Sequence, residues 1–396
     1  MNDGRLIDSK VSTHGWTRVM KNVARNFYKT VLCGPRKAKM LPFTSEIFGP
    51  PRNMARTPEY CARMGFLWKE VYPAHLNRIE PPDCINYPAQ RMLEHVPSVI
   101  PACGVAVLKN ARVMMDQGWV IGPSDTFLPD HSWFAPVPEK CPVYQTLRLK
   151  PDRHLHGVTL LLMSDFANVN YGHVLHDSFP RLHLFEQAAT HRIDEVDWVI
   201  TPKLSSDGKR GLFALLGIDR AKVLTREDAN ILSCETLIAP DFPGIRRNSP
   251  SWVAAFWRSK TGSVDRAKTR RLFVARRNTS REISNEREVI AVLEEFGFEV
   301  LNPQMSKAYP AFQEAQIIVG AHGAAMADCL FCQDGAAMVE LTPADHIFPY
   351  DYTIARAARM RYSSILGTSD PNSTKKDFII DTTLLKRTVS ELLTSQ

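Results

Sequence analysis

Short apolar runs alternate with amphipathic segments along the second part of the chain, from about residue 154. Apolar runs typical of buried strands occur at 156–163, 197–201, 221–224, 234–240, 271–276, 298–301, 316–320, 336–341 and 362–366. The segments 285–296, 311–316 and 382–394 carry apolar residues at helical spacing. Alternating strands and helices predict an α/β fold with parallel sheets covered by helices on both faces.

The region before residue 154 has a different pattern. Seventeen of the 27 prolines lie between Pro35 and Pro151, and proline is excluded from helix interiors and central strands. We therefore expect short strands, turns and extended wrapping there. A basic, polar stretch at about 258–270 is expected to link two βαβ units. This predicts an extension over 1–100 and two lobes over 101–262 and 263–396.

Residues 15–32 form a predicted amphipathic helix. Trp16, Phe27 and other apolar residues share one face, and Arg18, Lys21 and two further basic residues share the opposite face. A basic helix with a Trp/Phe face is typical of a segment that lies on an anionic membrane surface. A helix that docks on the body of its own protein has the same pattern, so both interpretations stay open.

Composition and charge narrow the possible classes of protein. The chain has 396 residues, 44% hydrophobic and 23% charged, which excludes a disordered or coiled-coil protein. Of the net charge of +7, +6 falls on residues 1–50, whereas a nucleic-acid binder spreads its charge over a fold. The sequence has neither a secretory signal nor about 18 consecutive apolar residues, so we expect a cytoplasmic protein without a spanning helix. The eight cysteines are then expected to be thiols, including the pair Cys329 and Cys332.

The densest polar cluster follows the strand 156–163. Asn170 is a predicted cap of the helix that begins there. His173 and Asp177 are spaced i, i+4 and share a helical face, with His176 beside them. A carboxylate one turn from an imidazole, near the carboxyl end of a strand, suits general base catalysis on a hydroxyl. Pro180 ends or kinks the helix and leaves Arg181 after the break.

Two other interpretations of this cluster remain. His173 and Asp177 are also the residues of an ordinary capping or ion-pairing couple. A metal site built from His154, His156 and the two histidines of the cluster is the less favoured alternative.

A second cluster leaves strand 271–276. Arg276 and Arg281 flank the loop before a helix whose predicted cap is formed by Asn285 and Glu288. Arginines at a strand end, beside helix amides, form a natural clamp for a diphosphate. Solvated loop arginines are the alternative.

A third cluster follows strand 316–320. His322 and Gly323 lie in a glycine-containing turn that lets backbone amides approach a ligand closely, and Glu340 ends the next strand. The turn lacks the third glycine of the dinucleotide fingerprint. Ligands of open α/β sheets bind at the carboxyl ends of strands, so all three clusters are expected to meet in one crevice.

Together the segments NYGHVLHDSFPRL (170–182), RRNTSREISNEREV (276–289) and the motifs within 297–343 resemble glycosyltransferase family 61. The resemblance covers roughly 155–365. It implies a GT-B-like fold, with two Rossmann-like lobes that face a central cleft. The acceptor would then face 101–262, and a nucleotide-sugar would bind 263–396. Asp328 stands where the family usually has Asn.

The resemblance also implies residue roles. Asp177 corresponds to the proposed general base, and His173 precedes it as in the family pattern. Supporting residues on the acceptor side are Asn170, His176 and Arg181. Residues implied to bind or border the donor are Arg276, Arg281, Asn285, Glu286, His322, Gly323 and Glu340.

The resemblance implies an inverting, metal-independent glycosyltransferase that moves a sugar from a nucleotide-sugar, expected to be UDP-linked, to a glycan hydroxyl in polysaccharide, capsule or glycoconjugate synthesis. No Asp-x-Asp motif occurs, in line with the expected absence of a metal. No cofactor is expected beyond the co-substrate. Residues 15–32 would form a peripheral contact with a membrane's inner face if that helix does not dock on the body of the protein. A catalytically inactive nucleotide- or glycan-binding protein is the main alternative, and a dehydrogenase is a weaker one.

Overall fold

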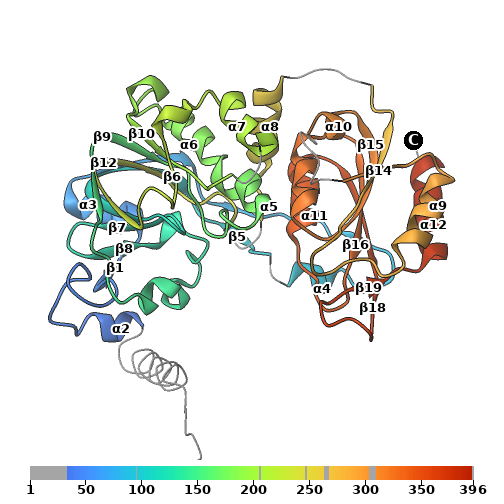
Figure 1. The fold of residues 1–396 in the computed structure, drawn as a ribbon, viewed down its shortest axis with the longest axis horizontal. Helices are drawn as coiled ribbons and strands as arrows, with labels where there is room; N and C mark the ends of the chain where they lie inside the picture. Colours follow the sequence, from blue (N-terminus) through green and yellow to red (C-terminus); the bar gives the residue numbers. More distant parts are fainter. Residues whose placement is uncertain are drawn as a thin grey trace, which may run out of the picture.

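The computed structural model describes residues 34–94, 96–204, 207–245, 248–262, 267–302 and 309–394. Its two main sheets lie side by side, with helix α8 (Ser251–Thr261) near their junction (Figure 1). The predicted α/β fold is confirmed, and the two sheets are consistent with two Rossmann-like lobes. The expectation of parallel sheets is wrong for part of the first sheet, where β6 (Cys103–Met114) and its neighbours pair antiparallel. The basic helix predicted at 15–32 lies outside the described residues.

The six-stranded sheet is entirely parallel. Its strands are arranged in the order β14 (Glu299–Leu301), β13 (Arg270–Val274), β15 (Ala315–Ala321), β16 (Ala337–Thr342), β17 (Arg361–Leu366) and β4 (Asp83–Cys84). Chain order reverses between β13 and β15, because β14 lies on the outer side of β13. Such a reversal is where open α/β sheets bind ligands, at the carboxyl ends of the strands.

Helices cover both faces of this sheet. Phe273 points to one face, where α9 (Glu286–Glu294) and α12 (Thr382–Thr394) pack. Leu272 and Val274 point to the other face, as the two-residue period of a strand requires. That second face packs in a core with Phe312 of α10 (Tyr309–Gln313) and Ile354 of α11 (Tyr350–Ala357).

The nine-stranded sheet is mixed. Its main path runs β1 (Asn53–Met54), β8 (Thr126–Leu128), β7 (Trp119–Gly122), β6 (Cys103–Met114), β12 (Ile231–Pro240), β9 (Arg153–Leu161), β10 (Trp198–Ile200) and β11 (Val223–Leu224), and β2 (Leu67–Tyr72) also pairs with β6. The strands from β12 to β11 are parallel, and β6 is antiparallel to β12. Helix α3 (Thr57–Met64) covers one face, and α6 (Arg181–Ala188) and α7 (Asp207–Leu215) cover the other.

One hydrophobic core extends from the nine-stranded sheet to the six-stranded sheet. Leu160 and Phe179 from the first side, Trp257 of α8, and Phe331 and Ile318 from the second side belong to the same cluster of buried side chains. The two lobes are therefore fused by packing as well as by the chain.

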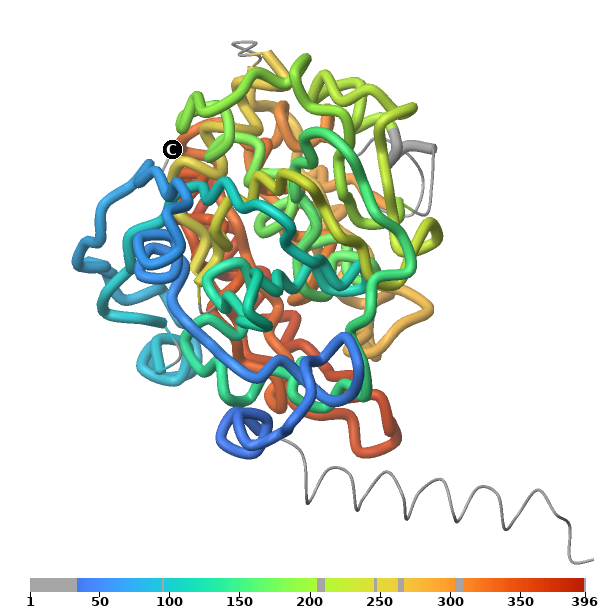
Figure 2. The backbone as a smooth tube through the Cα atoms, turned by 90° about the vertical axis from the view of Figure 1, so that its left-hand side faces the viewer, coloured from blue at the N-terminus to red at the C-terminus, as the bar shows by residue number. Residues whose placement is uncertain are grey.

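The first third of the chain contributes to both sheets. Strands β1 and β2 join the nine-stranded sheet, whereas β4 extends the six-stranded sheet beside β17. The remaining short elements are α2 (Pro35–Ala38), β3 (His75–Leu76), α4 (Gln90–Leu93) and β5 (Val99–Ile100). Figure 2 shows this blue-to-cyan segment looping over the outside of the first lobe. The expectation of short elements fails at β6, whose twelve residues contain no proline and form a long central strand.

Most elements lie within a few residues of their predicted positions. The helix predicted at 311–316 is shifted, since α10 ends at Gln313 and β15 already begins at Ala315. The chain passes from the first sheet to the second between β12 and β13, through α8. The domain limits at 100 and 262 stay predictions. Among the described residues, no helix is long and apolar enough to span a membrane.

Candidate active site

The helix predicted after Asn170 has a local widening that shapes the site. The Asn170 side chain accepts a hydrogen bond from the Gly172 amide at 2.9 Å and caps α5 (Tyr171–His173). The chain then continues as the π-helix η4 (Val174–Ser178), in which the Phe179 amide donates to the Val174 carbonyl. The indole of Trp257 donates to the Leu175 carbonyl at 2.6 Å. The predicted break at Pro180 is confirmed, and Arg181 begins α6.

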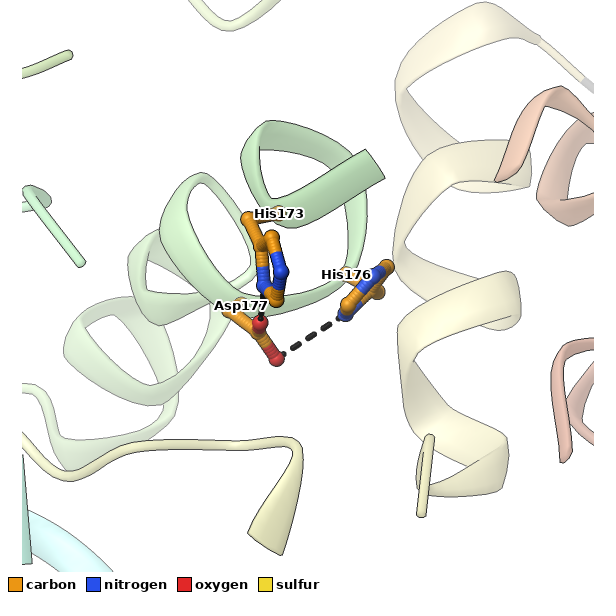
Figure 3. A group of neighbouring side chains, drawn as sticks. All are labelled: His173, His176 and Asp177. Carbon is orange, nitrogen blue, oxygen red and sulfur yellow. Dashed lines mark hydrogen bonds and ion pairs between the residues drawn. The ribbon is translucent and has the colours of Figure 1, made fainter. Parts of the chain in front are cut away.

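This turn brings one carboxylate between two imidazoles. His173 Nδ1 donates to Asp177 Oδ2 at 2.5 Å, and His176 Nδ1 lies 2.9 Å from Asp177 Oδ1 as an ion pair. Figure 3 shows both rings beside the carboxylate. Asp177 is fully buried. Burial alone would raise the pKa of Asp177, but His176 and His173 outweigh it and hold that pKa below its usual value.

Gly244 packs directly against this carboxylate. A Cβ at Gly244 would collide with Asp177 Oδ1, so only glycine allows the backbone to pass here. Gly244 therefore covers the same carboxylate oxygen that faces His176.

The carboxyl ends of β13 and β15 bring together an arginine and a glycine. Arg276 follows β13, and its Nε donates to the Ser280 carbonyl at 2.8 Å. A Cβ at Gly323 would collide with Arg276 Nη1, so the glycine turn and the guanidinium are in direct contact. Burial and neighbouring Arg281 lower the pKa of Arg276 to about 10, which leaves it cationic at neutral pH.

Arg281 has a left-handed backbone conformation, with φ of 64°. Its amide donates to the Lys375 carbonyl at 3.0 Å. The Nε atom of Arg281 is buried without a hydrogen-bond partner. Burial lowers its pKa, and Asp351 opposes that shift. Two arginines therefore lie close together, with an unsatisfied donor, at the place where an anion is expected.

His322 follows β15 and contacts two carboxylates. Its Nδ1 donates to Glu340 Oε1 at 2.7 Å and lies 3.2 Å from Asp351 Oδ2. Burial alone would lower the pKa of His322, but Asp351 and Glu340 raise that pKa to about 9. His322 is therefore an imidazolium at neutral pH. Because Nδ1 faces the carboxylates, Nε2 remains for a ligand.

A cavity of about 430 Å³ collects these groups. It lies between the two lobes, where α5 meets the 3₁₀ segment η8 (Ala324–Phe331). The approach is close, since a Cβ at Gly172 would lie 3.4 Å from Ala324 Cα. The predicted site residues that line the cavity are Asn170, His173, His176, Arg281, His322 and Gly323.

Aromatic residues close the cavity from both lobes. The Trp133 indole donates to the Tyr350 hydroxyl at 3.2 Å and so ties the first lobe to the start of α11. The Tyr350 ring lies 4.8 Å from the His176 ring and 5.8 Å from the His173 ring, centre to centre. These rings therefore form a wall of the cavity to which both lobes contribute.

Six predicted site residues do not line this cavity. One of them, Arg276, touches Gly323 of the lining. Asp177 and Glu340 lie behind the imidazoles that do. Glu286 accepts from Arg277 Nε at 2.8 Å, outside the pocket. Asn285 bonds both the amide and the carbonyl of Ile380 and the side chain of Glu288, so it joins α9 to the chain before α12. The capping box predicted for Asn285 is wrong in detail, because its side chain makes no bond to the helix amides.

Arg181 is fully buried and also lies outside the lining. Its Nη2 donates to the His131 carbonyl at 2.6 Å, while Nε and Nη1 have no hydrogen-bond partner. Burial lowers the pKa of Arg181 to about 10, and the nearby charges of Asp165 and Asp177 act in the opposite direction. Arg181 therefore supplies positive charge beneath the Asp177 cluster. Asp328, the departure from the family pattern, is buried and accepts from the Tyr171 hydroxyl at 3.3 Å.

Two groups of buried side chains have the composition of metal sites: His173, His176 and Asp177, and His322, Glu340 and Asp351. In a tetrahedral zinc site, with bonds of about 2.0–2.1 Å, neighbouring ligand atoms lie about 3.3 Å apart. The separations are 2.5 Å and 2.9 Å in the first group and 2.7 Å and 3.2 Å in the second, so the metal-independent site stays a prediction. The predicted alternative with His154 and His156 is not formed, since neither residue belongs to these groups.

The contribution of the segment before and within α11 to the site was not predicted from the sequence. His346, Phe348, Tyr350 and Asp351 all line the cavity. The signal was present as a run of histidine, aromatic and acidic residues shortly after β16, at the same sheet edge as the glycine turn. Gly244 was also missed, because its importance depends on a contact across 67 positions of the chain.

Comparisons with known proteins agree with the resemblance. Residues 171–339 match the family model described as Glycosyltransferase 61. An 88-residue segment is 28% identical to Alpha-1,3-arabinosyltransferase XAT2 of Oryza sativa subsp. japonica, covering 21% of this chain and 15% of that protein. An 84-residue segment is 33% identical to Xylan glycosyltransferase MUCI21 of Arabidopsis thaliana, covering 20% of this chain and 17% of that protein. The matches thus span less than a fifth of either relative.

Proposed function

We propose that this chain, which carries a glycosyltransferase 61 domain over residues 171–339, transfers a sugar from a nucleotide-sugar to a hydroxyl of a glycan. The observation that carries the proposal is the meeting of two chemically different half-sites in one cavity. One half offers imidazoles backed by a carboxylate, and the other offers cationic groups at a parallel-sheet switch point. Polysaccharide or glycoconjugate synthesis is the corresponding role.

The cationic half suits the donor's diphosphate. Arg276, Arg281 and protonated His322 surround the Gly323 turn, and Arg281 keeps a buried, unsatisfied Nε. As the bond between the anomeric carbon and the phosphate oxygen breaks, negative charge develops on the leaving diphosphate. Fixed cations at that point stabilise the transition state more than the ground state.

The imidazole half suits the acceptor. In the proposed step, the acceptor oxygen forms a bond to the anomeric carbon while its proton passes to the enzyme. The sequence-based prediction assigns this proton to Asp177. Because Asp177 is buried and its two oxygens face imidazoles, we assign the first contact to His173 Nε2, with Asp177 stabilising the imidazolium that forms.

We further propose inversion in a GT-B-like arrangement. The two half-sites come from opposite lobes, so an acceptor on the first-lobe side attacks a donor held by the second-lobe side. Attack from the side opposite the leaving group inverts the anomeric carbon. The residues named here account for proton transfer and charge stabilisation by side chains alone.

The names of the relatives guide the choice of donor. They describe an arabinosyltransferase and a xylan glycosyltransferase. We therefore propose pentosyl transfer as the first reaction to test, with UDP-arabinose and UDP-xylose, followed by hexosyl donors.

The test is a donor panel incubated with the full chain and glycan acceptors, read by product mass and product anomeric configuration. We expect transfer from at least one donor, with inverted configuration at the new bond. The alternative is a binding protein that has lost catalysis. Donor binding by calorimetry without turnover of any donor would favour that alternative over the proposed enzyme.

For location, we propose cytoplasmic residence with peripheral contact to a membrane's inner face, as predicted for residues 15–32. A described surface supports this. Met40, Phe43, Ile47 and Leu147 are exposed apolar residues near the basic residues Arg36, Lys39 and Arg148. Basic side chains around exposed apolar ones favour an anionic lipid surface. Flotation with anionic and neutral vesicles tests it, and equal recovery would reject it.

A further inference from the structure

A second cavity, of about 680 Å³, lies beside the first and has no role in the chemistry described above. Its walls come from the first lobe, from the segment leading into α8, and from α11. The residues on which the argument depends are Tyr72, Asp241, Ser249, Trp252 and Arg356.

Two elements separate the two cavities. In the segment after β8, Trp133 lines the first cavity and Ala135 lines the second. In α11, Ile354 lines the first cavity and Arg356 lines the second. The two cavities are therefore neighbours along the boundary between the lobes.

The second cavity contains buried polar atoms that lack partners. Ser249 is 5% exposed and Asp241 is 4% exposed, and both line the cavity. The Ser249 Oγ atom makes no hydrogen bond to the described residues. The Asp241 Oδ1 atom also makes none, although it lies 3.4 Å from His131 Nδ1. A buried polar atom without a hydrogen bond is unfavourable, so such atoms in a cavity wall point to a polar ligand that satisfies them.

The surroundings of Asp241 indicate which kind of ligand. Its Oδ2 accepts from the Trp68 indole at 3.1 Å and from the Gly104 amide at 2.8 Å. Burial, with the nearby charge of Asp130, raises the pKa of Asp241 well above its usual range. The raised pKa reflects surroundings that disfavour a negative charge, so this part of the wall suits a neutral hydroxyl better than an anion.

Aromatic rings form another part of the wall. The Tyr72 and Trp252 rings are stacked, with centres 5.6 Å apart and planes within 7° of each other. His183 stacks on Trp252 at 5.0 Å and contacts the Tyr72 hydroxyl at 2.7 Å, which fixes both rings. Flat, fixed aromatic surfaces beside hydroxyl-binding groups match the alternating apolar faces and polar edges of a sugar ring.

We propose that the second cavity binds a sugar unit of the acceptor chain, several units away from the hydroxyl that reacts in the first cavity. The proposal rests on the proposed glycosyltransferase function. Trp252 and Tyr72 provide apolar contact for the sugar, and Asp241 and Ser249 bond its hydroxyls. The protein then recognises the length of its acceptor as well as its end.

Binding of neutral oligosaccharides to the full chain tests this directly. The probes are xylohexaose and cellohexaose, each compared with its monosaccharide, and binding is followed by calorimetry and by tryptophan fluorescence without donor. We expect at least one hexaose to bind about tenfold more tightly than its monosaccharide. Loss of a neutral hydrogen bond costs a few-fold to about tenfold in affinity, so Ser249→Ala should weaken hexaose binding by that factor. Trp252→Ala should weaken it at least as much.

Matched controls separate a binding role from a structural one. Ser164→Ala removes another buried, unpaired serine hydroxyl that lines neither cavity, and it should leave hexaose affinity unchanged. Trp252→Phe keeps an aromatic surface and should restore part of the affinity lost in Trp252→Ala. UDP affinity should be the same in all these variants.

The two proposals fail in different ways. If hexaose binding is lost in Ser249→Ala while no donor is turned over, the glycan site stands and the enzyme proposal fails. If the wild type transfers sugar to a hexaose and Ser249→Ala leaves its KM unchanged, the enzyme stands and the second site is wrong. Absence of hexaose binding in the wild type, or equal binding in all variants, also overturns the second site.

Discussion

The two lobes each present a buried cluster of imidazoles and carboxylates to the same cavity, and the two clusters are opposite in composition. In the first lobe one carboxylate, Asp177, lies between two imidazoles. In the second lobe one imidazole, His322, lies between two carboxylates, Glu340 and Asp351. The same two side-chain types therefore form an anion held by bases in one lobe and a cation held by acids in the other.

The difference explains the opposite pKa shifts. The pKa of Asp177 is held below its usual value in spite of burial, because His176 and His173 favour its charged form. The pKa of His322 is raised to about 9 in spite of burial, because Asp351 and Glu340 favour the imidazolium. Neighbours, rather than residue type, decide which cluster handles a proton and which stabilises an anion.

Of the changes that test this comparison, Asp177→Asn should have the largest effect on turnover. The amide cannot stabilise an imidazolium, so we expect turnover to fall by about 10²–10⁴. Donor affinity should not change, since the donor groups belong to the other lobe. Steady-state kinetics and calorimetry with UDP give the two readouts. Normal turnover in this variant would remove Asp177 from the reaction.

Gly244→Ala disturbs the same cluster without changing its chemistry. The new Cβ collides with Asp177 Oδ1, and a displacement of about 1 Å at reacting groups costs up to about 10²-fold in rate. We expect a loss in kcat with little change in donor KM. Gly211→Ala is the matched control, because its Cβ has no neighbour within 4 Å. Equal activity of both variants would contradict the role of Gly244 beside Asp177.

Arg276→Ala acts on the other cluster. A charged hydrogen bond contributes about 1.5–3 kcal/mol, so UDP affinity should fall by about tenfold to a hundredfold, measured by calorimetry. Arg277→Ala is the control, since Arg277 pairs with Glu286 away from the cavity. Matching affinities for the two variants would place the diphosphate elsewhere.

The smallest expected effect is a pH dependence of stability. The pKa of His322 is about 9 in the folded chain and about 6.5 when unfolded, so folding takes up a proton between these pH values. Its contribution is complete below about pH 6.5 and is lost as pH rises toward 9, by roughly 1 kcal/mol per pH unit. Denaturant unfolding at several pH values measures this slope. In His322→Gln the slope should be reduced, and an unchanged slope would contradict the raised pKa.

Local patterns predicted much of the fold and about a third of the residues that line the cavity. Five strands of the six-stranded sheet follow predicted apolar runs of four to six residues, which tertiary contacts do not override. Strand β4 follows no such run. Ligands bind at the carboxyl ends of parallel strands, and this rule was enough to predict His173, His322 and Arg281 as lining residues. It could not predict Asp351 or Gly244, because the importance of these two residues arises from contacts between segments far apart in sequence. The opposite error occurred at Asn285 and Glu286. Both were predicted to border the pocket, but the structure shows Asn285 bonded to Ile380 and Glu286 bonded to Arg277.

The hydrophobic core that runs from one sheet to the other affects how the protein unfolds. A fragment that begins at residue 263 would lack β4, which is an edge strand of its sheet, and would leave Ile318, Phe331 and Ile354 without the cover of Trp257. The lobes are therefore expected to melt in one cooperative transition rather than two. Each half-site then depends for its stability on the other, and a damaging substitution in either lobe lowers the amount of the whole folded protein.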